Sequence, residues 1–412
     1  MLTQPAAVAA PPTRDLPVIG VYEPRLRTTT FCLAVAHGAR QDPRGGCGVA
    51  HLLEHLLFSL PSDGATSFAE RVERGGGHAN AQTGVETTLF YAQVAAEDAA
   101  GTADALLRAV LRPRLTDPAP FDRERAVVVS ELRTAAADPA DTVQDAAAAA
   151  VFPGHPLARP VGGDLDELAT LTPEGVLREH REVFLRAPMS LVVVGPAPVP
   201  GLDALLRDAL PTARTTAPGD VERPPLSAPD TTLPALPRGD DIAWVCLAGR
   251  TPAAGTPGTA AYELLATLLG SSPSSLLYRT LRGDESLSYS FAAWSRPYTE
   301  GGLWRLLAGV EGHAVERLVD LVRGLLTDIA EGRIRDEDLL AARRKTEMSL
   351  VLQAENPLDH ALLIALRGRA GTQPWSIDAN RAELAAVTAA DVSAAAAALL
   401  AEHVVVVRPE AS

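Results

Sequence analysis

The stretch GVAHLLEHLLF at residues 48–58 places two histidines and a glutamate inside an otherwise apolar segment. Its apolar residues have helical spacing, and residues i, i+3 and i+4 of a helix lie on one face. We therefore expect a helix over 49–58 from which His51, Glu54 and His55 project together. Two imidazoles four residues apart can bind one divalent ion, and polar groups in an apolar helix need such a partner.

The glutamate between the histidines suits a catalytic role. A catalytic zinc ion typically has three protein ligands and leaves a fourth position for water, whose pKa it lowers to about 7. The carboxylate of Glu54 would then take the proton of that water. The alternative is that His51 and His55 are hydrogen-bonded core residues, which is the usual interpretation of a lone histidine. The complete His-x-x-Glu-His pattern favours the metal site, and a third ligand would decide.

The composition excludes several other classes of function. The chain has 412 residues, of which 47% are hydrophobic, and a formal net charge of −14, so nothing predicts binding to nucleic acid or to an anionic membrane. Its three cysteines, Cys32, Cys47 and Cys246, form no Cys-x-x-Cys pair, which argues against a disulfide framework and a thiolate zinc site. The N-terminus does not resemble a signal peptide, and no apolar run reaches the roughly 18 residues of a membrane span. We expect a cytoplasmic protein.

Two stretches with alternating strand and helix patterns are separated by a segment rich in Pro, Thr and Asp. We place the first domain at 16–210, the linker at 211–238 and the second domain at 239–412. In both domains a similar motif (167–172 and 383–388) precedes a helix and a valine-rich strand. These patterns predict an α+β fold of two similar α/β-sandwich domains, each with a mixed, mainly antiparallel sheet flanked by helices. Coincidence in an alanine-rich chain is the alternative to an internal repeat.

Two motifs carry a resemblance to a known family. Residues 48–58 match Gly-x-Ala-His-x-x-Glu-His-x-x-Phe, and ERAVVVSE, from Glu124 to Glu131, matches Glu-Arg-x-Val-Val-x-x-Glu. The chain thereby resembles the M16 (pitrilysin/insulinase) metallopeptidases, in the smaller class that includes the mitochondrial processing peptidase. The resemblance implies that His51, His55 and Glu131 bind one Zn²⁺ per active site, with Glu124 as a supporting carboxylate behind the ligands. Between His55 and Glu131 lie 75 residues, as in the family.

A further match concerns the substrate. The segment GGHANAQT at 76–83 is similar to the family's Gly-Gly-x-x-Asn-Ala-x-Thr, an edge strand to which an extended substrate adds by backbone hydrogen bonds. The resemblance implies that Asn80, Ala81 and Thr83 contact the peptide. A simple hairpin is the alternative, and the two interpretations are compatible. After Phe58 the family often continues Lys-Gly-Thr, and this chain departs from that pattern.

The second half carries the family's Leu-Arg-x-x-x-x-Leu-x-Tyr-Ser pattern, here with Arg282 and Tyr289. In the family this pair binds the scissile carbonyl and steadies the oxyanion. The chemistry suits that role, because a guanidinium holds a carbonyl oxygen and a phenol donates a hydrogen bond where negative charge develops.

The resemblance implies a zinc-dependent endopeptidase that cleaves short or unfolded peptides, for processing or for degradation, with Glu54 activating water. In the family two halves face each other like a clamshell, and this chain would be one half. Because it carries both the zinc motif and the Arg/Tyr pair, a homodimer is the simpler expectation, and a heterodimer with a related M16 subunit is the other possibility. The rival function is a non-catalytic scaffold or assembly subunit of an M16 heterodimer.

Overall fold

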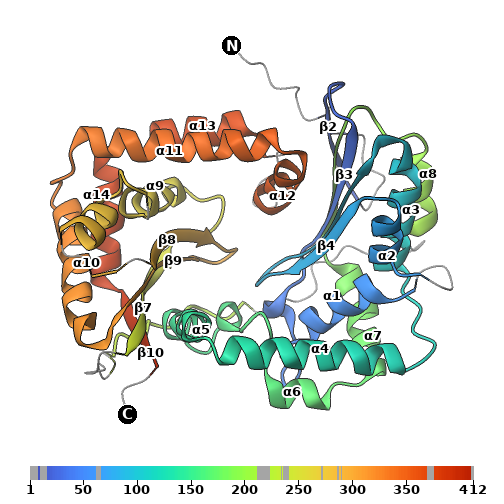
Figure 1. The fold of residues 1–412 in the computed structure, drawn as a ribbon, viewed down its shortest axis with the longest axis horizontal. Helices are drawn as coiled ribbons and strands as arrows, with labels where there is room; N and C mark the ends of the chain where they lie inside the picture. Colours follow the sequence, from blue (N-terminus) through green and yellow to red (C-terminus); the bar gives the residue numbers. More distant parts are fainter. Residues whose placement is uncertain are drawn as a thin grey trace. The chain divides into compact units, whose positions relative to one another are not determined.

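The chain divides into two units in the computed structural model (Figure 1). Unit 1 comprises Met1–Leu132, Pro160–Glu222 and Leu352–Ser376, and unit 2 comprises Arg133–Arg159, Arg223–Val351 and Ile377–Ser412. The structure describes residues 8–9, 16–61, 66–210, 223–232, 234, 241–270, 272–284, 287–288, 290–368 and 375–409.

A mixed six-stranded sheet forms the centre of unit 1. Its strands are β1 (Val8–Ala9), β2 (Val18–Tyr22), β3 (Thr28–Val35), β4 (His78–Thr83), β5 (Thr88–Ala95) and β6 (Met189–Gly195). They lie in the order β1-β2-β6-β3-β5-β4, with β2 and β6 parallel and the other neighbours antiparallel. The middle strands β3 and β6 are β-branched and apolar and are buried almost throughout, whereas β4 lies at the end of the sheet.

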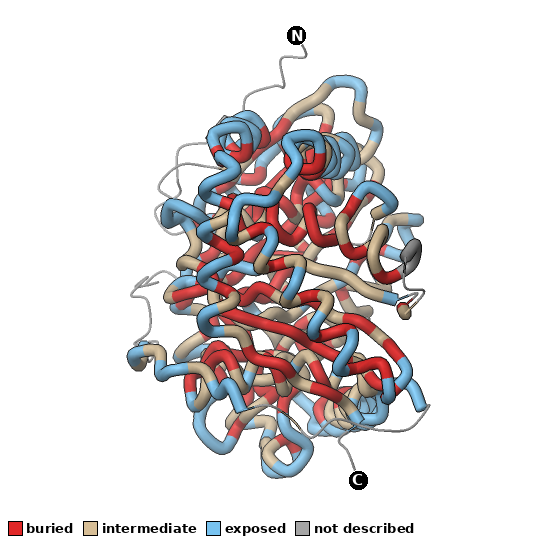
Figure 2. Tube along the Cα trace, turned by 90° about the vertical axis from the view of Figure 1, so that its left-hand side faces the viewer, coloured by how far each residue is buried: buried red, intermediate tan, exposed pale blue. Residues whose placement is uncertain are grey.

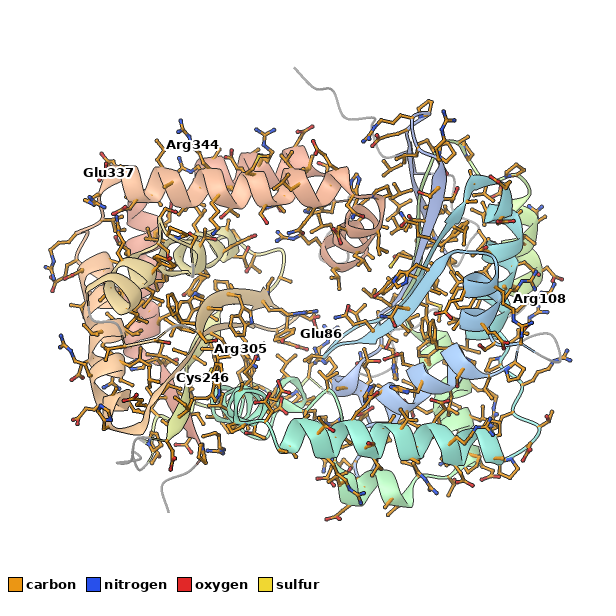
Figure 3. All side chains as sticks on the ribbon, in the orientation of Figure 1. Glu86, Arg108, Cys246, Arg305, Glu337 and Arg344 are labelled. Atoms are coloured by element: carbon orange, nitrogen blue, oxygen red, sulfur yellow. The ribbon has the colours of Figure 1, made fainter. Side chains whose placement is uncertain are left out.

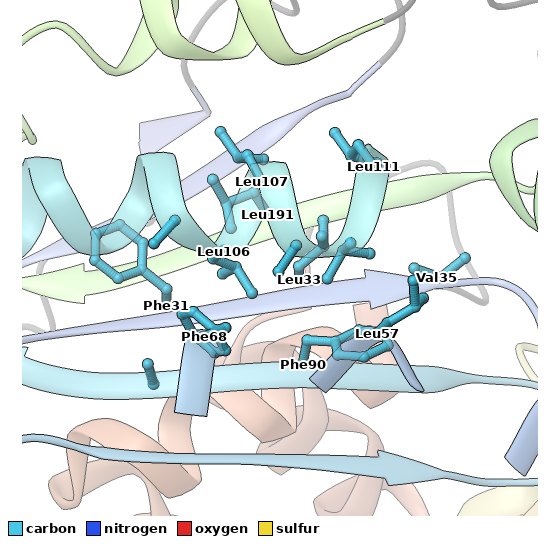
Figure 4. Close-up of a cluster of buried hydrophobic side chains, with 14 of the residues drawn as sticks. Phe31, Leu33, Val35, Leu57, Phe68, Phe90, Leu106, Leu107, Leu111 and Leu191 are labelled. Atoms are coloured by element: carbon cyan, nitrogen blue, oxygen red, sulfur yellow. The ribbon is translucent and has the colours of Figure 1, made fainter. Parts of the chain in front are cut away.

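Helices cover both faces of this sheet. One group consists of α1 (Val49–Ser59), α2 (Phe68–Arg74), α3 (Ala99–Leu111), α6 (Leu165–Thr170), α7 (Pro173–Glu182) and α8 (Leu202–Ala209), together with the first part of α4 (Ala119–Ala136) and the 3-10 turns η1 (Ala39–Gln41), η2 (Ala96–Asp98) and η4 (Phe184–Arg186). Figure 4 shows how Leu57 of α1 and Leu106 of α3 meet Phe31, Leu33 and Phe90 of the sheet in one buried cluster. On the other face, α12 (Pro357–Arg367) packs against β3 and β6.

Unit 2 contains a four-stranded antiparallel sheet in the order β10-β7-β9-β8. Its strands are β7 (Ile242–Thr251), β8 (Ser290–Pro297), β9 (Gly302–Glu311) and β10 (Val404–Arg408). Its helices are α5 (Pro139–Val151), α9 (Thr259–Leu269), α10 (Val315–Ala330), most of α11 (Asp336–Glu355), α13 (Ile377–Ala386) and α14 (Ala389–Ala401), with the 3-10 turns η3 (Pro156–Ala158) and η6 (Gly312–Ala314) and the short π-helix η5 (Tyr278–Asp284). Figure 3 shows Glu337 and Arg344, both exposed, on the outer side of α11.

Two helices belong to a unit that is built mainly from the other half of the sequence. α5 precedes the linker yet packs on β7 and β10, where its buried residues Val143, Ala147 and Val151 form one apolar stripe. α12 comes late in the sequence and belongs to unit 1. The two units are therefore discontinuous in sequence, whereas the predicted ranges 16–210, 211–238 and 239–412 are continuous. The reason is that the apolar stripe of a helix can be buried against any matching sheet face, not only against the nearest one in sequence. The proposal that these ranges mark two related halves of the chain stays a prediction.

The described part of the predicted linker lies against unit 2. Asp230 N donates to Ala150 O at the end of α5 (2.8 Å), and His155 Nε2 lies 3.1 Å from Pro224 O. The motifs at 167–172 and 383–388 precede the same series of elements, since a helix capped by Thr172 leads to β6 and a helix capped by Thr388 leads to β10.

The central strands of both sheets are mostly buried, whereas buried and exposed residues alternate along the helices (Figure 2). The prediction of an α+β fold with two domains is thus confirmed. Among the described residues, no single helix is long and apolar enough to span a membrane, and α13 and α14 pass that test only together, across a bend of 84°.

Candidate metal centre

Helix α1 presents its polar residues on one face. Leu52, Leu53, Leu56 and Leu57 are at most 1% exposed and anchor the helix in the core of unit 1. His51, Glu54 and His55 lie on the opposite, half-buried face, as their spacing predicts. The apolar face thus fixes the direction in which the two imidazoles point.

Glu131 of α4 meets the two histidines. The Nε2 atoms of His51 and His55 lie 3.2 Å apart, and Glu131 Oε2 lies 3.7 Å from the first and 3.5 Å from the second. One ligand atom from each residue falls within 4.8 Å of the others, and in the part of the chain that the structure describes this is the one such group of three. Two imidazole nitrogens and one carboxylate oxygen are a donor set typical of catalytic zinc sites, so the residues fit the ion.

The outer nitrogens of the imidazoles have their own partners. His55 Nδ1 lies 3.4 Å from Glu124 Oε2, and His51 Nδ1 lies 3.4 Å from the carbonyl oxygen of Gly162. A hydrogen bond at either place puts the proton on Nδ1 and leaves the Nε2 lone pair for a metal ion. Glu124 reaches this position because it precedes Glu131 by two helical turns on α4.

The pKa values of the two histidines shift in opposite directions. Burial lowers the pKa of His51, and the neighbouring His55 lowers it further. Burial also lowers the pKa of His55, but the hydrogen bond to Glu124 and the charges of Glu54, Glu131 and Glu124 outweigh it, so that this pKa is raised. The same hydrogen bond is the main cause that lowers the pKa of Glu124. The carboxylates therefore make His55 the more strongly proton-binding imidazole of the pair.

Glu54 faces the end of the edge strand. Thr83, the last residue of β4, donates its hydroxyl hydrogen to Glu54 Oε2 at 2.9 Å. Burial raises the pKa of Glu54, and the hydrogen bond from Thr83 acts against that rise. The β4–β5 turn behind Thr83 is held by an ion pair between Arg40 and Glu86. Figure 3 labels Glu86 beside the end of β4. A base whose pKa is raised toward neutrality, with a fixed orientation, suits proton transfer.

The predicted substrate strand is an edge strand. β4 pairs with β5 on one side and, among the described residues, with no strand on the other. Asn80 is exposed and its Oδ1 accepts a hydrogen bond from Ala81 N (2.9 Å). An edge strand next to a metal centre can receive an extended peptide, so the position of Asn80 and Ala81 is compatible with the role predicted for them.

The structure does not describe the side chains of the two residues predicted in the second half, Arg282 and Tyr289. Tyr289 lies outside the described residues. The backbone of Arg282 belongs to η5, a short π-helix, and its side chain lies outside the described part of the structure. Their roles stay predictions.

Two contributors to the centre were absent from the sequence-based prediction. Gly162 supplies the carbonyl that faces His51, and Asp42 binds the first turn of α1. A Gly-Gly pair at 162–163 and an Asp-Pro step at 42–43 are visible in the sequence. Neither pattern indicates its partner, because Gly162 is 111 residues away from His51, and the bonds of Asp42 to residues six and eight positions further on depend on how the intervening loop folds.

Comparison with known proteins gives a consistent result. A family model described as "Insulinase (Peptidase family M16)" matches residues 18–165, and one described as "Peptidase M16 inactive domain" matches residues 170–346. An uncharacterized zinc protease of Mycobacterium tuberculosis is 29% identical over 416 residues, covering 96% of this chain and 92% of its own length. The mitochondrial-processing peptidase subunit beta of Blastocladiella emersonii is 27% identical over 377 residues, covering 88% and 76%.

The fold is likewise similar to solved structures. A protease from Helicobacter pylori has a TM-score of 0.85 at 19% identity, with 98% of this chain and 99% of that chain covered. A protein from Pseudomonas fluorescens described as a peptidase M16 inactive domain has a TM-score of 0.83 at 16% identity, with 98% of both chains covered. Fold and relatives define a metallopeptidase-like protein of two α+β domains. This chain belongs to peptidase family M16, which confirms the resemblance inferred from its sequence.

Proposed function

We propose that this chain is a zinc-dependent endopeptidase that cleaves short or unfolded peptides, in processing or in peptide degradation. One observation carries the proposal. The imidazoles of His51 and His55 and the carboxylate of Glu131 converge within 4.8 Å, and Glu54 projects from the same helix face as the histidines. A structural cluster would not need an additional carboxylate that a hydroxyl group holds in place.

His51, His55 and Glu131 would hold the Zn²⁺ ion. When bound, that ion supplies a Lewis acid and lowers the pKa of water to about 7. Glu54 accepts a proton from the attacking water on its carboxylate and later delivers that proton to the leaving amine nitrogen. The peptide C–N bond breaks and the elements of one water molecule are added across it. Thr83 keeps one carboxylate oxygen of Glu54 oriented during these transfers.

The peptide is proposed to bind along β4 as an added strand, with Asn80, Ala81 and Thr83 beside it. Arg282 and Tyr289 are proposed to bind the scissile carbonyl, as the family resemblance implies. We also propose a dimer located in the cytoplasm, with a homodimer preferred because one chain carries both the metal motif and the Arg/Tyr pair. The relative named as a subunit, the beta subunit of mitochondrial-processing peptidase, supports an assembly of more than one chain.

A non-catalytic subunit is the second candidate function. It is favoured by the match of residues 170–346 to a model described as an inactive domain. The metal cluster and Glu54 lie within residues 18–165, in the part matched by the insulinase model. Loss of catalysis in such a protein should remove ligands or base, and these residues are present.

The deciding experiment is cleavage of a fluorogenic peptide library by the purified chain. The proposal predicts cleavage that Zn²⁺ supports, that a chelator abolishes and that Glu54→Gln abolishes. Glu70→Gln is the matched control, because Glu70 lies in α2, outside the cluster, and its substitution should leave cleavage unchanged. A folded, Zn²⁺-loaded chain that cleaves no peptide in the library would refute the proposal for the chain alone and favour the non-catalytic subunit.

A further inference from the structure

His51 lies in the first turn of α1, where the backbone is not held by hydrogen bonds within the helix alone. α1 begins at Val49, so that His51 is only the third helical residue. The first amide N–H groups of a helix have no acceptor within the helix, and helix ends fray unless these groups are capped. The N-cap residue is Gly48, in the left-handed region (φ 105°), and it has no side chain to serve as acceptor. The position of the first ligand therefore depends on an acceptor from elsewhere.

Asp42 supplies that acceptor. Its Oδ2 accepts a hydrogen bond from Gly48 N (2.7 Å) and its Oδ1 accepts one from Ala50 N (2.8 Å). Asp42 is 2% exposed, so both bonds are shielded from water. Charge-assisted hydrogen bonds are the stronger kind, and a negative charge at a helix N-terminus interacts favourably with the helix dipole. One buried carboxylate thus binds the residues on both sides of Val49, directly before His51.

Asp42 is itself held near the turn that directly follows Thr83. It follows the 3-10 turn η1, and Asp42 N donates to Ala39 O (3.1 Å). The same turn is bound to the β4–β5 turn, because Ala39 N donates to Gly84 O (3.1 Å) and Arg40 N donates to Val85 O (2.9 Å). The cap is therefore attached to the part of the sheet that orients Glu54.

The loop before α1 is held from its other side by the segment at 162–167. Cys47 N donates to Glu167 Oε2 (2.6 Å), and Asp164 N donates to Cys47 O (3.2 Å). Gly48 and Gly163 touch through their backbones, since a Cβ at Gly163 would lie 2.5 Å from the Gly48 Cα. This contact holds the carbonyl group of Gly162, the residue before Gly163, next to His51 Nδ1.

We propose that Asp42 is a positioning residue of the metal centre. By clamping the first turn of α1 between the β4–β5 turn and the 162–167 segment, it fixes the Nε2 atom of His51 relative to His55 and Glu131. The proposal rests on the proposed function in so far as His51 is taken to be a zinc ligand. Because the proposal concerns the binding of Zn²⁺, it can be tested without any peptide.

The test is Zn²⁺ binding by Asp42→Asn, measured by competition with a chromophoric chelator, and the visible spectrum of the Co²⁺-substituted chain. The amide keeps the size of the side chain but loses the charge and turns an NH₂ group toward a backbone N–H. Groups that orient metal ligands contribute about 10–100-fold to metal affinity, and we expect a loss in that range with an altered Co²⁺ spectrum. The matched control is Asp138→Asn, which alters a cap of α5 where Asp138 Oδ1 accepts from Ala140 N (2.8 Å). It should leave Zn²⁺ affinity unchanged.

The outcomes separate the two proposals. A folded Asp42→Asn chain with wild-type Zn²⁺ affinity and an unchanged Co²⁺ spectrum would overturn the positioning role. A wild-type chain that binds no Zn²⁺ would overturn both proposals, whereas one that binds Zn²⁺ and cleaves nothing would overturn only the proposed function. Should Asp42→Asn fail to fold, Glu167→Ala removes the half-buried side chain of α6 that accepts a hydrogen bond from the same loop, at Cys47 N. We then expect a loss of about tenfold, the low end of that range, and wild-type affinity would again contradict the proposal.

Discussion

Substitution of Gly163 by alanine tests whether the loop contact beside His51 is as tight as the structure indicates. Gly163 has a φ of +104°, and a Cβ there would lie 2.5 Å from the Gly48 Cα and 2.8 Å from the Cys47 carbonyl oxygen. A left-handed conformation costs a non-glycine residue about 1–2 kcal/mol, and overpacking against neighbours that cannot yield costs about 1–3 kcal/mol. We therefore expect Gly163→Ala to lower the free energy of unfolding by about 2–5 kcal/mol.

Gly76→Ala is the matched control for the backbone cost alone. Gly76 also has a positive φ, +76°, but a Cβ there would meet nothing within 4 Å. Both glycines belong to unit 1, so the same unfolding transition reports on both. We expect Gly76→Ala to cost about 1–2 kcal/mol, less than Gly163→Ala.

The assay is denaturant unfolding of both variants, followed by Zn²⁺ titration under native conditions. Relief of the clash must move the 162–163 segment away from α1, so Gly163→Ala should also weaken Zn²⁺ binding, whereas Gly76→Ala should not. Equal stabilities of the two variants, with equal Zn²⁺ affinities, would refute the reasoning that this contact positions His51.

Two further predictions concern the carboxylate behind His55 and a buried histidine of the core. Glu124→Gln removes the charge beside His55 Nδ1 and should weaken Zn²⁺ binding by about 10–100-fold in a chelator competition; unchanged affinity would contradict its supporting role. His180 is buried, its Nε2 lies 2.8 Å from Val110 O, and burial is the main cause that lowers its pKa from 6.5 to about 4. Because the unfolded chain binds this proton more readily, the folded state should lose about 3 kcal/mol as the pH falls from 6.5 to 4, and denaturant unfolding of His180→Gln should show a shallower pH dependence. Identical pH dependence of both proteins would contradict this.

The sequence predicts the parts of the centre that obey helical spacing. His51, Glu54 and His55 lie on one face of α1 because residues i, i+3 and i+4 of any helix do so, and the leucines between them had to face the core. Glu131 could be assigned only through the family resemblance, since nothing in its own helix distinguishes it from a surface glutamate. The structure then places it at the histidines.

Other features depend on how loops fold and on contacts between distant segments, which local patterns do not encode. Asp42 and Gly162 bind the first turn of α1 from two sides, and each would pass for an ordinary loop residue in the sequence. The exchange of α5 and α12 between the two units was unpredictable for the same reason. The stripe of Val143, Ala147 and Val151 specifies an apolar partner but does not specify which sheet provides it.

The central claim is that His51, His55 and Glu131 hold a catalytic zinc ion beside Glu54. The measurement that tests it most directly compares zinc content and peptide cleavage in two variants of the purified chain, Glu131→Gln and Glu54→Gln. The account predicts that Glu131→Gln loses both zinc and cleavage, while Glu54→Gln retains one zinc ion per chain and loses cleavage alone. Full zinc content in Glu131→Gln, or undiminished cleavage by Glu54→Gln, would contradict it.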